Sequence, residues 1–313
     1  MHTRPTPRVG GIAVFGALGL FSIFGLGSIS GTYSAFVFVT SLLFFVGLAE
    51  DFGFHMSPQR RMLAAVSSSL LTIWLSGVWL PRAGIPVLDP FMEYSAVGIP
   101  ITILVTAGIS NGFNLIDGVN GLASLTAIVA ALALSQIADI SGYSTMVHLP
   151  LFVAAAVFGF FLMNYPFGLI FLGDAGAYTI GFVLSWFGIA VLVNAPDVSP
   201  WAMLLTFFWP AADTLLAVYR RLRRNKGVSA PDRLHVHQIM MRGIEICVLG
   251  QNRRQISNPL TTLVLAPLVI APPIVGVLLW NQNWNSFLAV LAFALLLFVG
   301  YAAAPSLIRR FRR

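Results

Sequence analysis

The chain has 313 residues, of which 58% are hydrophobic and only 9% are charged, and its mean hydropathy is +0.86. A soluble protein of this size would need far more charge to cover its surface, so the composition excludes an ordinary soluble domain. The net charge is +7, but the basic residues gather in a few segments, and a nucleic-acid partner is not needed to explain it. Cys247 is the only cysteine, which excludes an intrachain disulfide.

Ten apolar segments recur along the whole length, most of them about 17 to 21 residues long, enough to cross ~30 Å of hydrocarbon as a helix. They lie near 11–28, 33–48, 62–80, 96–110, 121–138, 147–163, 176–194, 199–219, 259–279 and 286–304. Alternating strand patterns are absent, and only helices or closed barrels satisfy their backbone in lipid. We therefore predict an all-α, polytopic membrane bundle of about ten transmembrane helices, forming one domain over residues 1–313.

The basic residues predict the orientation. With residue 1 in the cytoplasm, every one of the 18 Lys and Arg residues except Arg82 falls on the cytoplasmic side, as the positive-inside rule requires. The cytoplasmic segments are then 1–10, 49–61, 111–120, 164–176 and 220–258. Asp51, Asp117 and Asp174 stand at the inner ends of different spans. Because carboxylates at membrane depth are costly, we expect these three to converge on one cytoplasmic cleft.

The first polar motif in chain order is "PTPRVGG", residues 5–11. Pro5 and Pro7 keep the chain extended, and Gly10 and Gly11 allow a close backbone approach. An ordinary turn leading into a span is the alternative interpretation.

The second motif is "GLAEDFGFHMSPQRRM", residues 47–62. Ser57-Pro58 is a helix start signal. The preceding pair, Glu50 and Asp51, gains nothing from the positive-inside bias, so it suggests a cation site or a proton acceptor. A charged loop between spans is the alternative.

The third motif, "SNGFNLIDGVNGLAS" over residues 110–124, places Asn111, Asn114, Asp117 and Asn120 at steps of three. On a helix such residues are neighbours and form a drifting polar stripe, which the glycines between them can interrupt. Amide and carboxylate oxygens suit Mg²⁺, which takes one or two carboxylates and leaves its other positions to water and phosphate. An Asn/Gly turn is the alternative.

Two further motifs follow. In "FLGDAGAY", residues 171–178, Asp174 opens a span and can act as an N-cap, a metal ligand, or both. In "PDRLHVHQIMMRG", residues 231–243, His235 and His237 share a side only if the backbone there is extended. Two His without a Cys cluster are weak evidence for zinc, whereas donors near arginines favour a diphosphate or nucleotide site. A structural His pair is the alternative.

Taken together, in this order and on one face, the five motifs resemble the polyprenyl-phosphate N-acetylhexosamine-1-phosphate transferases. That family includes the phospho-MurNAc-pentapeptide translocase, and "DRLHVHQ" looks closer to the branch that initiates O-antigen and other lipopolysaccharide or cell-wall polysaccharides. The resemblance implies transfer of a sugar-1-phosphate from a UDP-sugar, UDP-GlcNAc by default, to undecaprenyl phosphate, with release of UMP. It also implies a Mg²⁺ cofactor, which Mn²⁺ could replace, and a homodimer is compatible with it.

The resemblance also implies roles for individual residues. Asp51, Asp117 and Asp174 would be catalytic; Asp117 and Asp174 would serve the metal–diphosphate site, and Asp51 would lie near the attacking lipid phosphate. The substrate-binding residues would be Asn111, Asn114, Asn120, Arg233, His235 and His237. The enzyme would lie in the bacterial inner membrane as a multi-pass protein, with membrane lipid as a partner, no nucleic acid, and its active face toward the cytoplasm.

Four departures from the family pattern keep other interpretations open. Glu50 and Asn120 stand where the family usually has Asp, and Gln238 stands where it usually has a third His. Relatives also usually carry one more span before "PTPR". The alternatives are a peptidoglycan-type translocase, an inactive homologue that acts as an assembly scaffold, and a transporter. A transporter would place acids near the bilayer midplane and often shows a repeated half, neither of which the sequence has.

Overall fold

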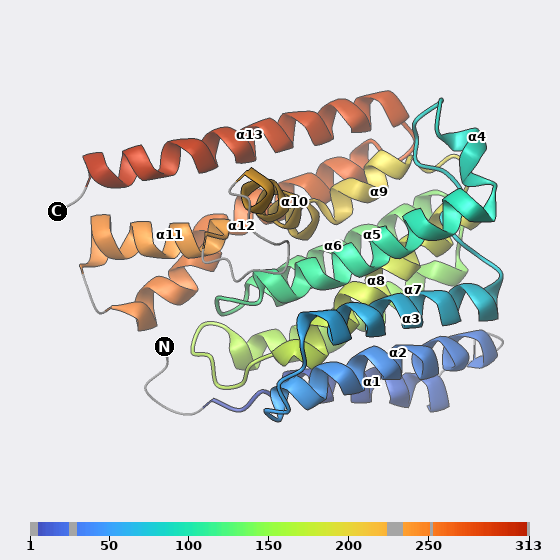
Figure 1. Cartoon of the computed structure of the whole chain (residues 1–313), viewed down its shortest axis with the longest axis horizontal. Coiled ribbons are helices and arrows are strands. Elements are labelled where there is room, and N and C mark those ends of the chain that lie inside the picture. Colours follow the sequence, from blue (N-terminus) through green and yellow to red (C-terminus); the bar gives the residue numbers. More distant parts are fainter. Residues whose placement is uncertain (1–5, 25–29, 224–233, 251–252, 312–313) are drawn as a thin grey trace.

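The computed structural model describes residues 6–24, 30–223, 234–250 and 253–311, and every regular element within these ranges is a helix (Figure 1). The elements are α1 (Gly10–Phe24), α2 (Ser30–Asp51), α3 (Pro58–Ser76), α4 (Asp89–Met92), α5 (Ser95–Ile116), α6 (Leu122–Ile140), α7 (Thr145–Asn164), α8 (Gly173–Asn194), α9 (Pro200–Thr206), α10 (Phe208–Arg223), α11 (Val236–Ile244), the π-helical η1 (Glu245–Leu249), α12 (Arg254–Leu278) and α13 (Asn283–Arg310). The predicted all-α class is confirmed.

Each predicted apolar segment overlaps a described helix or helix pair. By length and hydropathy, seven of the described helices can cross a membrane, or eight if α9 and α10 form one bent span. The helix α1 has only 15 residues, and Arg60, Arg61 and several serines make α3 less apolar than its neighbours. The chain is therefore a multi-pass membrane protein, whereas the count of ten spans stays a prediction.

The predicted span 199–219 is not one straight helix. Its two parts, α9 and α10, meet at Phe207 with a bend of 86°. Pro210 explains the break, because it lacks the N–H that would bond to the carbonyl of Thr206 if the helix continued. In Figure 1, α10 is seen nearly end-on while the long helices lie across the view. This helix therefore leaves the bundle axis.

At the centre of the bundle lies α8, and most of its residues are buried. It packs against α1, α2, α5 and α6. One polar contact marks the α5–α8 seam: the Ser110 hydroxyl donates to the Tyr178 carbonyl at 2.8 Å. Because α8 is surrounded on most sides, its first turn, which carries Asp174, is held in a defined place.

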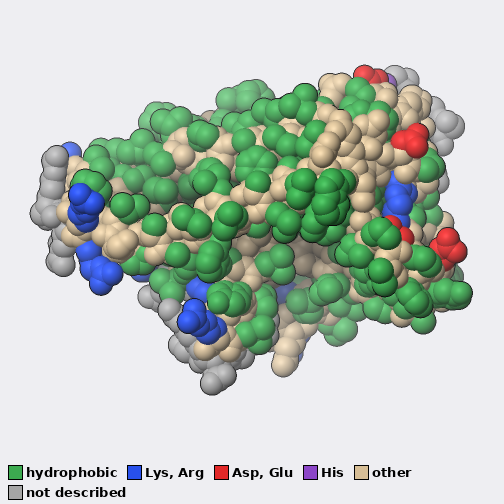
Figure 2. Space-filling view, turned by 90° about the horizontal axis from the view of Figure 1, so that it is seen from above, with side chains coloured by type: hydrophobic (Ala, Val, Ile, Leu, Met, Phe, Trp, Pro, Cys, Tyr) green, Lys and Arg blue, Asp and Glu red, His purple; other side chains and the backbone are tan. Residues whose placement is uncertain are grey.

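The two ends of the bundle differ in charge. Figure 2 shows hydrophobic side chains along the flanks, Lys and Arg mainly at one end, and Asp and Glu at the other. The basic end is the one at which α13 ends and α11 lies in Figure 1. At the opposite end, Arg82 donates to the carbonyls of Leu192, Ala195 and Val198 at 2.7, 3.1 and 2.7 Å, close to where α8 ends. The one basic residue predicted to lie outside is thus used to satisfy a helix C-terminus.

Candidate active site

A cavity of about 540 Å³ brings together residues that lie far apart in the sequence. The described residues that line it are Arg8, Asn114, Asp117, Gly118, Val119, Asn120, Asn164, Phe171, Gly173, Asp174, Met241, Arg254, Gln255 and Asn258. Every one of them belongs to a segment predicted to face the cytoplasm. The structure places Asp117 and Asp174 at one cavity, as predicted, whereas Asp51 does not line it and instead contacts the backbone at the start of α8.

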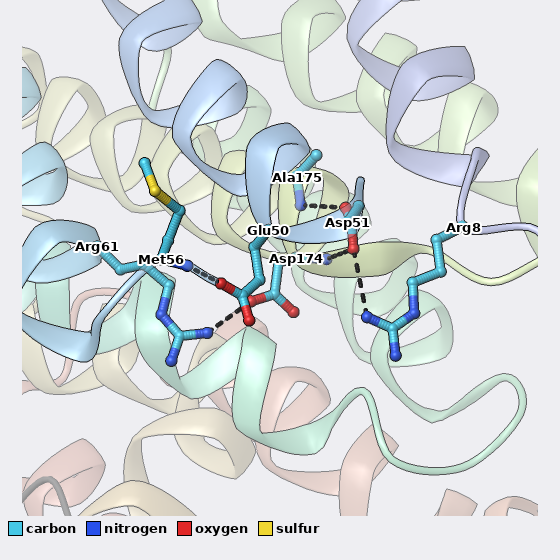
Figure 3. A network of polar contacts seen from close by, with 7 residues as sticks. All are labelled: Arg8, Glu50, Asp51, Met56, Arg61, Asp174 and Ala175. Atoms are coloured by element: carbon cyan, nitrogen blue, oxygen red, sulfur yellow. Dashed lines mark hydrogen bonds and ion pairs between the residues drawn. The ribbon is translucent and has the colours of Figure 1, made fainter. Parts of the chain in front are cut away.

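Asp51 is bound to the start of α8. Its two carboxylate oxygens accept hydrogen bonds from the backbone N–H groups of Asp174 and Ala175, each at 3.0 Å (Figure 3). The contact needs glycine at 173, where φ is +75° and an added Cβ would collide with the Asp51 carboxylate. The idea that Asp174 caps its own helix is therefore wrong, because the carboxylate of Asp51 occupies the first-turn N–H groups.

The N-terminal motif holds Asp51 from the other side. The backbone N–H groups of Gly10 and Gly11 donate to the carbonyls of Phe171 and Leu172 at 2.9 and 2.8 Å, so the chain lies directly against the loop before α8. The Arg8 guanidinium lies 3.8 Å from the Asp51 carboxylate and is about half exposed at the cavity (Figure 3). The close approach expected at the two glycines is a contact with protein backbone.

Asp174 points away from its own helix toward α3. Arg61 Nη1 donates to Asp174 Oδ2 at 2.7 Å, and both side chains are about four-fifths buried (Figure 3). Ser57 caps α3 as predicted by accepting from the Arg60 N–H, which fixes the turn that carries Arg61. Glu50 accepts from the Met56 N–H and so closes the α2–α3 loop. Sequence reasoning did not select Arg61, although it stands within the second motif.

Asp117 lies at the end of α5 and is crowded by other acids. Burial raises the pKa of its carboxyl well above the ordinary value, and the neighbouring carboxylates of Asp174 and Asp51 raise it further, while Arg8 opposes the shift. A charged Asp117 is therefore unfavourable in the protein alone. A cation in the cavity would relieve that repulsion.

The donor set fits a hard cation of the Mg²⁺ type. Asp117 and Asp174 line the cavity together with the amide side chains of Asn114, Asn120 and Asn258. Among the described residues no group of three or more His, Cys, Asp or Glu is arranged to hold a metal. Mg²⁺ needs no such cage, since it binds through one or two carboxylates and completes its shell with water and phosphate. Two crowded carboxylates beside open space meet that requirement.

The asparagines of the third motif have different environments. Asn114 lines the cavity, whereas Asn111 lies further back on α5 and does not. Asn120 is held on three sides: its Nδ2 donates to the Pro166 carbonyl, its N–H donates to Asn258, and its carbonyl accepts from Thr262. A carboxylate at position 120 would face the Pro166 carbonyl, acceptor against acceptor. The amide therefore suits this chain's own structure.

Asn164, which the sequence reasoning passed over, shapes the same turn. Its Oδ1 accepts from the Gly121 N–H at 2.6 Å, and its Nδ2 donates to the Ile170 carbonyl at 2.8 Å. It thereby ties the loop after Asp117 to the loop before Asp174. A polar residue at the end of an otherwise apolar span was the available signal.

The two histidines of the last motif, His235 and His237, are both buried. His235 has an extended backbone (ψ 150°), and the rings of His235 and His237 stack with centroids 5.8 Å apart, so they share a side as predicted. His235 Nδ1 lies 2.6 Å from the carboxylate of Asp213, a residue that the sequence reasoning did not select. Arg233 lies outside the described residues.

His237 packs against the Asp117 turn. A Cβ added at Gly118 would collide with its Nε2, so only glycine allows this approach. Burial lowers the pKa of His237 to about 4, against the opposing pull of Asp213, and the ring is neutral at neutral pH. Neither ring nitrogen has a hydrogen-bond partner among the residues that the structure describes. The start of α11 and the loop after α5 are thus in direct contact.

Comparisons with known proteins agree with this arrangement. The family model described as glycosyl transferase family 4 matches residues 33–192, which include all three aspartates. A relative from Yersinia pestis, undecaprenyl-phosphate alpha-N-acetylglucosaminyl 1-phosphate transferase, is 28% identical over 100% of this chain and 85% of its own length. A probable undecaprenyl-phosphate N-acetylglucosaminyl 1-phosphate transferase from Bacillus subtilis is 26% identical over 77% of this chain and 67% of its own length. Decaprenyl-phosphate N-acetylglucosaminephosphotransferase from Mycobacterium tuberculosis is 27% identical over 82% and 69%.

Proposed function

The chain belongs to glycosyl transferase family 4, and from this premise we propose that it transfers N-acetylglucosamine-1-phosphate from UDP-GlcNAc to a polyprenyl phosphate. The membrane-bound products of such a transfer begin lipid-linked glycans. The observation that carries the proposal is the cleft at the basic end of the bundle, where Asp117 and Asp174 from separate loops line one cavity. The undecaprenyl and decaprenyl phosphate transferases that resemble this chain support the acceptor class.

The step is a phosphoryl transfer between two phosphates. An oxygen of the lipid phosphate attacks the sugar-bound phosphorus of UDP-GlcNAc. The bond from that phosphorus to the bridging oxygen breaks, and UMP leaves with the electron pair. The lipid phosphate is already largely ionised at neutral pH, so positioning and charge neutralisation contribute more than a general base.

Residues at different positions around the cavity would have different roles in this step. Asp117 and Asp174 would hold Mg²⁺, which when bound neutralises the charge of the diphosphate. Arg8 lines the cavity next to Asp51, where its guanidinium can bind a phosphate oxygen. Asp51 keeps the start of α8 in place, and so acts on the site through the position of Asp174. Arg254, Gln255 and Asn258, at the start of α12, offer donors at the far wall.

The membrane location follows the same logic. The acceptor's apolar tail stays among the exposed hydrophobic flanks of the bundle, and its phosphate reaches the cleft at the end of the spans. We place that end in the cytoplasm of a bacterium, at the inner membrane, because the basic residues gather there and UDP-sugars are cytoplasmic. Homodimer formation remains a proposal that a mass measurement in detergent would test.

The test is release of UMP by the purified protein. We expect UMP only when UDP-GlcNAc, polyprenyl phosphate and Mg²⁺ are all present, and a lipid product that carries the sugar. Mn²⁺ in place of Mg²⁺ and a panel of other UDP-sugars would define the cofactor and the donor. UDP-MurNAc-pentapeptide as the preferred donor would indicate the peptidoglycan reaction. A folded protein that binds uridine nucleotides and releases no UMP with any donor would indicate a scaffold.

A further inference from the structure

We propose that Asp213, on α10, is a positioning residue that anchors His235 and the start of α11 against the Asp117 turn and so sets the affinity for the UDP-sugar. The inference rests on the proposed function and deepens its donor half. Nothing in the transfer step requires Asp213 to touch a substrate. Its effect comes through the residues that it holds.

Both oxygens of the Asp213 carboxylate are used. Oδ2 lies 2.6 Å from His235 Nδ1, and Oδ1 accepts from the Val236 N–H at 3.1 Å. The side chains of Asp213 and His235 are 1% and 3% exposed. A buried carboxylate is costly unless it is paired and hydrogen-bonded. These two contacts, across 22 residues of chain, satisfy that requirement for Asp213.

The same carboxylate caps the helix that follows. Val236 is the first residue of α11, and the preceding residue, His235, makes no side-chain cap of its own. Asp213 supplies the missing acceptor and a negative charge at the positive end of the helix dipole. It also fixes the imidazole, because a carboxylate accepts the proton on Nδ1 and leaves Nε2 as the other polar atom of the ring. One residue thus sets the start of α11 and the orientation of His235.

The other side of α11 reaches the cavity. His237, two residues further on, packs against Gly118, which follows Asp117. Met241, one turn later, lines the cavity wall. A shift of α11 would therefore move both the wall and the turn that carries Asp117. The helix α10, which carries Asp213, is itself held against α13, because the Arg220 guanidinium lies over the Tyr301 ring, 5.1 Å from its centroid.

The experiment compares purified Asp213→Asn with the unaltered enzyme. We expect the KM for UDP-GlcNAc to rise at least tenfold and the affinity for UMP, measured by calorimetry, to fall by a similar factor. The KM for polyprenyl phosphate should stay within twofold and the melting temperature within a few degrees. The control is Asp197→Asn, an exposed acid near Arg82 at the opposite end of the bundle, and it should leave all four quantities unchanged.

A double-variant comparison separates positioning from general damage. If Asp213 acts through His235, then His235→Ala should raise the donor KM, and Asp213→Asn should add little to it. Should Asp213→Asn fail to fold, His235→Ala leaves the Val236 contact intact and carries the same donor-selective test. Gly118→Ala would disturb the contact with His237 from the Asp117 turn, and it should also raise the KM for UDP-GlcNAc more than the KM for polyprenyl phosphate.

Two results would overturn the inference while leaving the proposed function intact. One is a folded Asp213→Asn enzyme with a donor KM within twofold of the unaltered value. The other is an equal loss for donor and acceptor, which indicates only a less stable enzyme. If the unaltered protein neither releases UMP nor binds it, the proposed function fails and the inference fails with it.

Discussion

Asp51, Asp117 and Asp174 lie in one corner of the molecule, but their carboxylates are engaged in different ways. The carboxylate of Asp51 accepts hydrogen bonds from two backbone N–H groups of α8, and that of Asp174 is paired with Arg61. Asp117 lies at the cavity among like charges, which raise the pKa of its carboxyl beyond the effect of burial. The three residues should therefore respond differently to the loss of their charge.

For Asp117→Asn we expect activity and stability to separate. The amide removes a charge that burial and the neighbouring acids disfavour, so the melting temperature should hold or rise. Transfer should fall roughly 100-fold or more, as when a group that stabilises transition-state charge is removed. UMP release and thermal unfolding in detergent are the two measurements. Asp51→Asn is the contrasting variant and should lose stability as well, because it caps α8. Near-normal turnover in folded Asp117→Asn would remove Asp117 from the site.

The buried His237 gives the protein a pH-dependent stability. Because its pKa of about 4 lies below the ordinary value of about 6.5, the folded state binds fewer protons than the unfolded state between these values. The contribution of neutral His237 to the free energy of unfolding is therefore fully present above about pH 6.5. It falls as the pH drops toward 4, by at most about 3 kcal/mol. Unfolding of the unaltered protein and of His237→Gln across this range should show a flatter profile for the variant. The matched control, His55→Gln at an exposed loop residue, should retain the slope; parallel profiles for His237→Gln would refute the assignment.

Sequence could identify most of the site residues but not their partners. Asp117, Asn114 and Asp174 were readable because polar side chains stood at the ends of apolar spans. The capping role of Asp51 was not readable, since it depends on α2 and α8 lying side by side across 123 residues. Asp213 carried a usable signal, because an acid inside an apolar segment needs a partner. Which residue supplies that partner is a property of the folded chain.

At the scale of elements, the junction of α2 with α8 carries the site. Gly173 opens α8 with a positive φ, and its missing side chain makes room for Asp51. We expect Gly173→Ala to destabilise the protein by more than the roughly 1–2 kcal/mol that a left-handed backbone alone costs. Transfer activity should fall as well, because Asp174 would move with the helix start.

A matched variant at Gly53 separates the backbone cost from the loss of the Asp51 contact. Gly53 also has a positive φ, +88°, but an added Cβ there would meet nothing within 4 Å. Gly53→Ala should therefore show the backbone cost alone and keep its activity. Equal unfolding temperatures and equal activities in the two variants would show that the Asp51 contact with α8 contributes nothing.

The helices themselves were largely predictable, and their geometry was not. Runs of apolar residues indicate where helices lie, because lipid leaves few other solutions for the backbone. The bend between α9 and α10 was missed, although Pro210 in the middle of span 199–219 marks the place where helix hydrogen bonding must stop. Apolar length measures how far a segment can reach, but it contains no direction.

For the whole molecule, the unequal charge of the two ends predicts a single orientation. In a Cys247→Ser background, Val87→Cys would lie at the acidic end and Phe54→Cys at the basic end, and both positions are well exposed, at 79% and 71%. In intact spheroplasts a membrane-impermeant maleimide should label only the cysteine at 87. The cysteine at 54 should react only after permeabilisation. The opposite pattern would invert the molecule and place the cleft outside the cell.

The three hydrogen bonds that Arg82 donates near the end of α8 have a consequence for the order in which the structure forms during synthesis. In the predicted orientation Arg82 crosses to the outer side soon after α3 is synthesised, yet the first carbonyl that accepts its hydrogen bond belongs to Leu192, 110 residues later. At ordinary translation speeds the ribosome needs roughly 5–20 seconds to supply that stretch. During this interval the guanidinium cannot donate to any of its three carbonyl acceptors near the end of α8. The helices made before α8 therefore lack these hydrogen bonds until α8 has been synthesised.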